Sequence, residues 1–116
     1  FSELTAERYY KVSEQSLSNL LDQLEELIQE EGDDTFDLEY SSGVLTLKLG
    51  NLGTYVINKQ PPNKQIWLSS PISGPKRYDF DTKSNLWFYS RDGESLDSIL
   101  SKELSQLLGV KVELEL

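Results

Sequence analysis

The sequence predicts an α+β two-layer sandwich, with the N- and C-terminal helices packed on one face of an antiparallel sheet of about six strands. Three observations predict this fold class. Apolar residues recur at three- and four-residue steps near both ends of the chain, and they alternate with polar residues in between. Turns of only a few residues separate the alternating segments, which favours antiparallel neighbours. The length of 116 residues, without a repeat or linker, predicts one domain over residues 1–116.

The first amphipathic helix is predicted from about Glu3 to Glu31. Its apolar stripe is formed by Leu17, Leu20, Leu21, Leu24, Leu27 and Ile28. We expect Tyr10 to extend this stripe towards the N-terminus. Gly32 is a natural residue at which to end the helix, and acidic residues occupy the side opposite the stripe.

Strands are predicted at residues 36–40, 44–49, 54–60, 64–69, 76–80 and 86–89. In the first of them, strict alternation points Phe36, Leu38 and Tyr40 inward. Short turns rich in glycine, proline or serine connect the strands, with a loop over residues 70–75 and a polar turn over residues 81–85. In the last strand the parity is ambiguous, and we expect Trp87 to pack in the core.

The second amphipathic helix is predicted over residues 96–108. Its apolar stripe is formed by Leu96, Ile99, Leu100, Leu104, Leu107 and Leu108. Gly109 ends the helix, and residues 110–116 form a short alternating tail. Two helices of this kind cover one face of the sheet, so the other face meets solvent.

The chain contains no cysteine, histidine or methionine. It therefore has no disulfide, no Cys-ligated cluster, no Ser-His-Asp triad and no conventional zinc site. Any metal must be held by oxygen ligands. The sequence also has no apolar run of about 20 residues and no basic, apolar signal stretch, so we expect a soluble mature domain that does not enter a membrane.

The negative charge is concentrated in one third of the chain. The net charge is −9, and residues 1–39 hold 12 acids against 2 bases. Nucleic acid is a poor partner for such a chain, because phosphate binding requires a cationic patch. Asp22 and Glu26, and Glu26 and Glu30, are like-charge pairs four residues apart, which destabilise a helix by a few tenths of a kcal/mol each.

A bound cation or a basic partner would relieve the repulsion between these carboxylates. The alternative interpretation is that the acidic face is simply solvated and binds nothing. Exposed carboxylates offer hard oxygen ligands whose shell water completes, so a metal site here is expected to be weak and labile. Asp34, Asp37 and Glu39 follow at the junction between helix and strand.

Strand parity places Trp67 on the uncovered face of the sheet, among polar side chains. The residues expected around it on that face are Asn58, Gln60, Gln65 and Arg77. A flat aromatic side chain rimmed by amides and an arginine is typical of a protein-docking hot spot. A half-covered tryptophan with no docking role is the alternative.

The stretch from Leu52 to Asp79, LGTYVINKQPPNKQIWLSSPISGPKRYD, closely resembles the signature of eukaryotic frataxins. The motif 42–46, the strand around Trp87 and the turn 91–93 fit the same family in order. The resemblance covers nearly the whole chain and is weakest in residues 1–35 and after Leu108. It implies the frataxin sandwich and a mitochondrial matrix protein whose transit peptide has been removed.

The resemblance further implies an iron-binding regulator of iron–sulfur cluster assembly. Frataxins dock on the complex of cysteine desulfurase and scaffold protein and speed sulfur transfer, and some are thought to supply Fe(II). Carried over by position, the partner-binding residues are Asn58, Gln60, Gln65, Trp67 and Arg77. The iron-binding acidic ridge maps to Glu14, Asp22, Glu25, Glu26, Asp34 and Asp37.

The ridge departs from the family pattern in several places. Gln15, Ser18, Gln29 and Thr35 are neutral where some relatives carry acids, and Glu30, Glu31 and Glu39 are expected to compensate. The expected cargo is iron, as Fe2+ or Fe3+, bound weakly by carboxylates, with no cluster held by the chain.

Two other functions stay open. One is a ferroxidase or iron-storage protein that acts as an iron-driven oligomer, although a monomer is the expected resting state. Di-iron oxidation normally uses Glu-x-x-His motifs, and this chain has no histidine. The other is a plain acidic interaction module with incidental cation binding.

Overall fold

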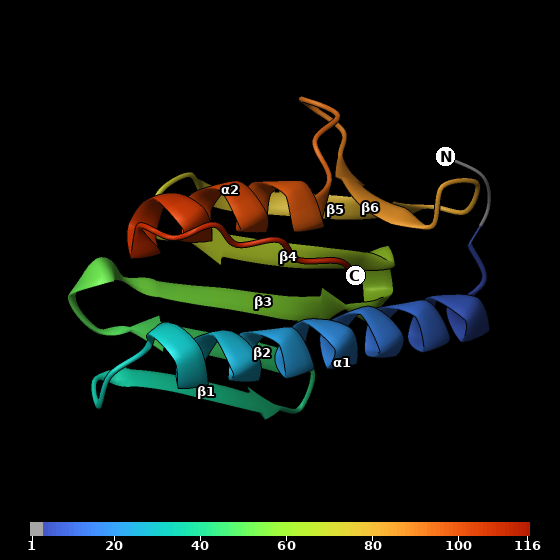
Figure 1. The fold of residues 1–116 in the computed structure, drawn as a ribbon. Coiled ribbons are helices and arrows are strands. Elements are labelled where there is room, and N and C mark those ends of the chain that lie inside the picture. Colours follow the sequence, from blue (N-terminus) through green and yellow to red (C-terminus); the bar gives the residue numbers. More distant parts are fainter. Residues whose placement is uncertain (1–3) are drawn as a thin grey trace.

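The computed structural model describes residues 4–116, in which two helices pack on one face of a six-stranded antiparallel sheet (Figure 1). The strands follow one another in the order β1-β2-β3-β4-β5-β6. The elements are α1 (Ala6–Glu31), β1 (Phe36–Ser41), β2 (Val44–Leu49), β3 (Thr54–Gln60), β4 (Gln65–Ser70), β5 (Gly74–Asp81), β6 (Leu86–Tyr89) and α2 (Leu96–Leu108). The predicted fold class is therefore confirmed.

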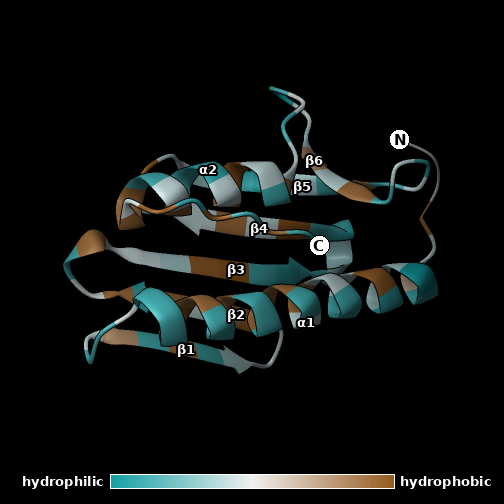
Figure 2. Cartoon of the chain, in the orientation of Figure 1, coloured by the Kyte–Doolittle hydropathy of each residue, from teal (hydrophilic) through white to brown (hydrophobic). Residues whose placement is uncertain are grey.

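Helix α1 begins after Thr5, whose side chain accepts a hydrogen bond from the backbone N–H of Arg8 at 3.1 Å. The helix begins later than expected, and Glu3 lies outside the described residues. Leu17, Leu20 and Leu24 are fully buried, as their spacing predicts. Figure 2 shows hydrophilic and hydrophobic residues alternating around this helix.

The expectation for Tyr10 was wrong. Tyr10 is 63% exposed, whereas the adjacent Tyr9 is buried. Tyr9 lies four residues before Ser13, which is also buried, so the buried stripe passes through small polar residues in this part of the helix. The stripe was misplaced because serine does not register as apolar in a sequence pattern.

The sheet is a simple meander in which burial alternates as predicted. In β2 and β3 the side chains of Leu45, Leu47, Tyr55 and Ile57 face the helices and are buried. The β1–β2 hairpin turns through Ser42 and Gly43, which both have positive φ, at 54° and 78°. Such a turn matches the twist of the two strands, so it fixes their register.

Strands β1, β4 and β5 differ from the predictions by one or two residues at their ends. Lys64 has φ 53° and ψ 44°, so it closes a short 3-10 turn and β4 starts at Gln65. Strand β5 starts at Gly74 because Ser70 pairs with Gly74 across a turn of only three residues. Of the loop expected over residues 70–75, residues 71–73 form the turn, whereas Ser70, Gly74 and Pro75 belong to the strands.

Helix α2 lies beside α1 on the same face of the sheet (Figure 1). Ser95 caps its first turn by accepting from the backbone N–H of Ser98 at 3.3 Å, and Gly109 ends it with a left-handed φ of 70°. Trp87 is 1% exposed, which confirms its core role, and its Nε1 donates to Ser16 Oγ at 3.0 Å.

The tail after Gly109 runs back between the two helices (Figure 1). Val112 and Leu114 are buried, and their backbone N–H groups donate to Ser105 Oγ at 2.8 Å and Ser101 Oγ at 2.9 Å. The predicted alternation is present, but the tail bonds to helix side chains and not to a strand. It closes the core on the helical side.

Candidate functional site

The uncovered face of the sheet brings the predicted docking residues together on two neighbouring rungs. Asn58 of β3 pairs with Trp67 of β4, which pairs with Arg77 of β5. On the next rung, Gln60 pairs with Gln65. Residues directly opposite on one face of a sheet lie about 4.5–5.5 Å apart at Cβ, so these side chains are neighbours.

Direct contacts hold the Trp67 indole in place. The Arg77 guanidinium carbon lies 4.8 Å from the centre of the Trp67 ring, within cation–π range. On the other side, Trp67 Nε1 donates to Gln65 Oε1 at 2.9 Å, and Gln65 Nε2 donates to Asp79 Oδ1 at 3.0 Å. Trp67 is consequently half-buried, although it lies on the open face.

Tyr9 of α1 supports this surface from the opposite side of the sheet. Its hydroxyl donates to the backbone carbonyl of Gln65 at 2.8 Å and accepts from the backbone N–H of Gln60 at 3.0 Å. Burial raises the pKa of Tyr9, so the hydroxyl stays protonated and can make both bonds. The end of the β3–β4 hairpin, which carries both glutamines, is thereby tied to α1.

A shallow hollow of about 690 Å3 adjoins Trp67 and Arg77. It extends from β3 and β4 across β5 to the chain that follows β6, and its lining includes Lys76, Asp79 and Arg91. Sequence reasoning missed these three residues as surface neighbours of the tryptophan. The signal that was available is the position of Asp79, which has the same strand parity as Arg77.

The predicted metal ligand Glu14 is occupied by protein contacts. Its carboxylate forms an ion pair with Lys59 and accepts from the Tyr40 hydroxyl at 3.1 Å. Burial lowers the pKa of Lys59, and the Lys59 ammonium also lies 4.9 Å from the centre of the Tyr10 ring. Glu14 therefore tethers α1 to β1 and β3 and is less available to a metal than the other acids.

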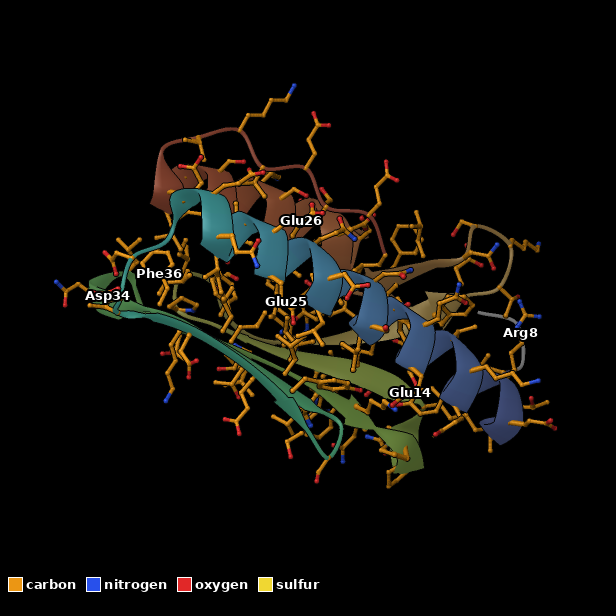
Figure 3. All side chains as sticks on the ribbon, turned by 60° about the horizontal axis from the view of Figure 1, so that its bottom comes forward. Arg8, Glu14, Glu25, Glu26, Asp34 and Phe36 are labelled. Carbon is orange, nitrogen blue, oxygen red and sulfur yellow. The ribbon has the colours of Figure 1, made fainter. Side chains whose placement is uncertain are left out.

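The remaining acids of α1 lie exposed but point to different sides. Figure 3 shows Glu25 on the side of α1 nearer the sheet and Glu26 on the side nearer α2. Asp22, Glu26 and Glu30 are spaced four residues apart and follow one line along the exposed surface of the helix. All four carboxylates are accessible to hydrated cations.

The acids after α1 lie on two further surfaces. Asp34 is exposed in the turn before β1, next to Asp33, whose pKa is lowered by hydrogen bonds from the Thr35 hydroxyl and backbone N–H. Asp37 and Glu39 of β1 point to the uncovered face of the sheet, where Asp37 is opposite Lys48. The predicted ridge is thus distributed around the β1 edge of the molecule.

Within residues 4–116, no three acidic side chains are close enough together to hold one metal ion. The arrangement therefore offers single carboxylates and pairs, which can bind a cation only with water completing its coordination shell. In the same described part of the chain, no helix has the length and apolarity needed to cross a membrane.

Comparison with known proteins identifies the family. The model of the frataxin-like domain matches residues 2–110. The chain is 45% identical over 97% of its length to mitochondrial frataxin of Arabidopsis thaliana, of which it spans 60%. It is 48% identical over 95% of its length to the mitochondrial frataxin homolog of Schizosaccharomyces pombe, of which it spans 70%. These names support a mitochondrial location.

Solved structures give the same assignment. A structure described as trimeric frataxin from the yeast Saccharomyces cerevisiae, complexed with ferrous iron, superposes with a TM-score of 0.77 at 42% identity, covering 94% of this chain and 91% of that one. A second yeast frataxin structure gives a TM-score of 0.78 at 46% identity, covering 92% and 85%. With the family model, the relatives and the sandwich fold in agreement, the chain belongs to the frataxin family.

Proposed function

We propose that this chain regulates iron–sulfur cluster assembly in the mitochondrial matrix by docking on a complex of cysteine desulfurase and scaffold protein. Docking stimulates sulfur transfer by the desulfurase. The chain also binds iron weakly through its exposed carboxylates and supplies Fe(II) to the complex as cargo. The partner-binding residues are Asn58, Gln60, Gln65, Trp67 and Arg77.

The observation that carries the docking proposal is the held indole of Trp67 on the uncovered face. Its contacts with Arg77 and Gln65 fix the ring before a partner arrives. A pre-ordered side chain loses less conformational freedom on binding, so more of its contact energy appears as affinity. Tryptophan and arginine are also the residue types that most often dominate interface energies.

The acidic ridge supports the proposal electrostatically. Residues 1–39 carry nearly all of the net negative charge, and α1 presents Asp22, Glu26 and Glu30 along one line. A basic surface on the desulfurase would be attracted to this line, which speeds association and orients the chain more than it raises final affinity. The same carboxylates are the proposed iron ligands, with Glu25, Asp34, Asp37 and Glu39, and Glu14 after release from Lys59.

The decisive experiment measures sulfide production by a purified desulfurase–scaffold complex with and without this protein. The native chain is expected to stimulate it, and Trp67→Ala is expected to abolish at least nine-tenths of the stimulation, since a central hot spot contributes about 2 kcal/mol or more. Ile72→Ala is the matched control, because Ile72 is 46% exposed in the β4–β5 turn and lies outside the docking residues.

Trp67→Ala must first be shown to fold, by thermal unfolding with the native chain alongside. No stimulation by the folded native chain would overturn the proposal. Equal loss in Trp67→Ala and Ile72→Ala would show that the uncovered face has no special role.

The second candidate function is an oligomeric ferroxidase or iron-storage protein. It is favoured by the yeast relatives, whose structures are described as trimeric. Because the described residues of one chain form no three-carboxylate group, an iron-oxidising site would have to be shared between copies. Iron oxidation confined to oligomeric fractions would favour this candidate over the regulator.

A further inference from the structure

The hollow beside Trp67 exists because β6 is shorter than β5. Strand β6 pairs only with Tyr78 to Asp81, so the first half of β5 has no neighbour on that side within residues 4–116. The Tyr89 backbone bonds to Glu94 at 3.0 Å and Gly93 at 2.8 Å, so the chain turns back on itself there. The hollow is lined by β5, by residues 89–91 at the start of this turn, and by residues of β4 together with Asn58 of β3.

Three basic side chains line this space in a chain of net charge −9. Lys76 is largely buried, with its ammonium 3.9 Å from Asp92 Oδ2 and 5.5 Å from the centre of the Tyr89 ring. Arg77 and Arg91 are exposed. In the described part of the chain neither arginine has a carboxylate within ion-pair distance.

The two acids at the rim are already engaged. Asp79 accepts from Gln65, and Asp92 accepts from the Glu94 backbone N–H at 2.9 Å and lies beside Lys76. Among the described residues, the positive charges of Arg77 and Arg91 are therefore not balanced by a carboxylate in the hollow. Guanidinium binds carboxylates through paired hydrogen bonds, which gives both strength and direction.

The exposed edge of β5 is a poor template for an added strand. Pro75 has no backbone N–H to donate, and proline on an edge strand limits pairing with other chains. Recognition at this edge must then come from side chains. Trp67 and Tyr89 provide apolar surface beside the two arginines, which fits a short peptide with acidic and apolar groups.

We propose that this hollow binds an acidic segment of a protein partner, with Arg77 and Arg91 each engaging a carboxylate. The inference deepens the proposed function and rests on it for the partner, since the hollow is continuous with the docking residues around Trp67. Arg91 is thereby added to the docking surface. A short protein segment is favoured over nucleic acid because a polyphosphate backbone would extend beyond the two arginines over a chain of net charge −9, which repels it.

The test is an NMR titration of the full chain with a blocked tetrapeptide of alternating glutamate and aspartate, at millimolar concentrations and constant ionic strength. The signals of the Arg77 and Arg91 side chains and of the Trp67 indole N–H are expected to shift together. Arg91→Glu is expected to weaken peptide binding about fivefold or more, because it removes one exposed ion pair and places a like charge in its position. Lys83→Glu makes the same charge change in the exposed β5–β6 turn and is expected to leave binding within twofold.

Absence of these shifts, or equal weakening by Lys83→Glu and Arg91→Glu, would overturn the inference. A single-stranded oligonucleotide that shifts the same signals at lower concentration would overturn the choice of a protein partner. The outcome is separable from that of the sulfide assay. Peptide binding can fail while the native chain still stimulates sulfide production, and stimulation can fail while the peptide still binds at Arg91.

Discussion

At the scale of single residues, Glu103 is the clearest feature that sequence reasoning passed over. It is 5% exposed, and its Oε1 accepts from the Tyr55 hydroxyl at 2.8 Å and from Ser70 Oγ at 2.5 Å. Ser70 Oγ in turn accepts from the backbone N–H groups of Ile72 and Ser73, at 3.0 and 3.1 Å. One buried carboxylate thus connects α2, β3 and the β4–β5 turn. Burial, followed by the bond to Glu103, raises the pKa of Tyr55.

Replacement of Glu103 by alanine is expected to lower the free energy of unfolding by about 3 kcal/mol, because two buried hydroxyls lose their acceptor. Glu103→Gln keeps an acceptor oxygen and is expected to lose less than half as much. Urea unfolding followed by tryptophan fluorescence measures both. A more stable Glu103→Ala variant would mean that desolvation of the buried carboxylate outweighs its hydrogen bonds.

The position of Glu103 was available in the sequence. It falls on the stripe of Ile99, Leu100 and Leu104 at helical spacing, so its burial followed from the pattern. Its partners did not, because Tyr55 and Ser70 lie 48 and 33 residues away along the chain. The partners of Tyr9 were likewise not available from the sequence, since its hydroxyl bonds to backbone groups more than 50 residues away along the chain.

At the scale of elements, the tail after α2 is part of the helical layer, because it runs between the two helices and bonds to side chains of both. The Gln23 side chain of α1 binds both backbone polar groups of Glu115: Gln23 Nε2 donates to the Glu115 carbonyl at 2.5 Å, and the Glu115 N–H donates to Gln23 Oε1 at 2.9 Å. The buried side chains of Val112 and Leu114 complete the core. The tail has no regular hydrogen-bonded pattern of its own, so its order depends on the two helices.

Leu114→Ala is expected to lower the free energy of unfolding by about 2–3 kcal/mol, the usual cost of truncating a buried leucine. Thermal unfolding measures it, with Glu113→Ala as the control because the Glu113 side chain is 73% exposed. Equal stabilities for the two variants would show that the tail does not pack on the helices in solution.

The strands were predictable to within a few residues because each has one buried face and therefore a period of two. Trp87 illustrates the limit of that argument. Its four-residue strand gave no clear parity, and the core role follows from packing against Tyr9 and Phe80, whose ring centres lie 6.2 and 5.0 Å away.

At the scale of the whole molecule, the acids of α1 and the docking surface lie on different parts of the fold. The line of Asp22, Glu26 and Glu30 belongs to the helical layer, whereas Trp67 and its neighbours lie on the uncovered face of the sheet. If the acids of α1 bind iron and the sheet binds the partner, iron binding and partner docking should respond to different substitutions.

The double variant Asp22→Asn/Glu26→Gln is expected to bind Fe(II) at least threefold more weakly, because it removes two hard oxygen ligands. It is also expected to be more stable by about 0.5 kcal/mol, since two like-charge pairs are relieved. Anaerobic calorimetry and urea unfolding measure the two effects. Trp67→Ala should leave the iron affinity unchanged.

Glu113→Gln/Glu115→Gln is the matched control, with the same change of net charge in exposed tail residues. An equal fall in iron affinity in both double variants would show that iron responds only to overall charge. That result would favour a plain acidic interaction module with incidental cation binding.

The sequence by itself determined the fold class, the inward and outward residues of the longer strands, and the family, because these depend on local periodicity and on a long contiguous motif. It did not determine which acids are free, where the tail lies, or that Arg91 lines the same hollow as Arg77. Those features join residues far apart along the chain. Only tertiary packing brings such residues within the few ångströms over which ion pairs, hydrogen bonds and aromatic contacts act.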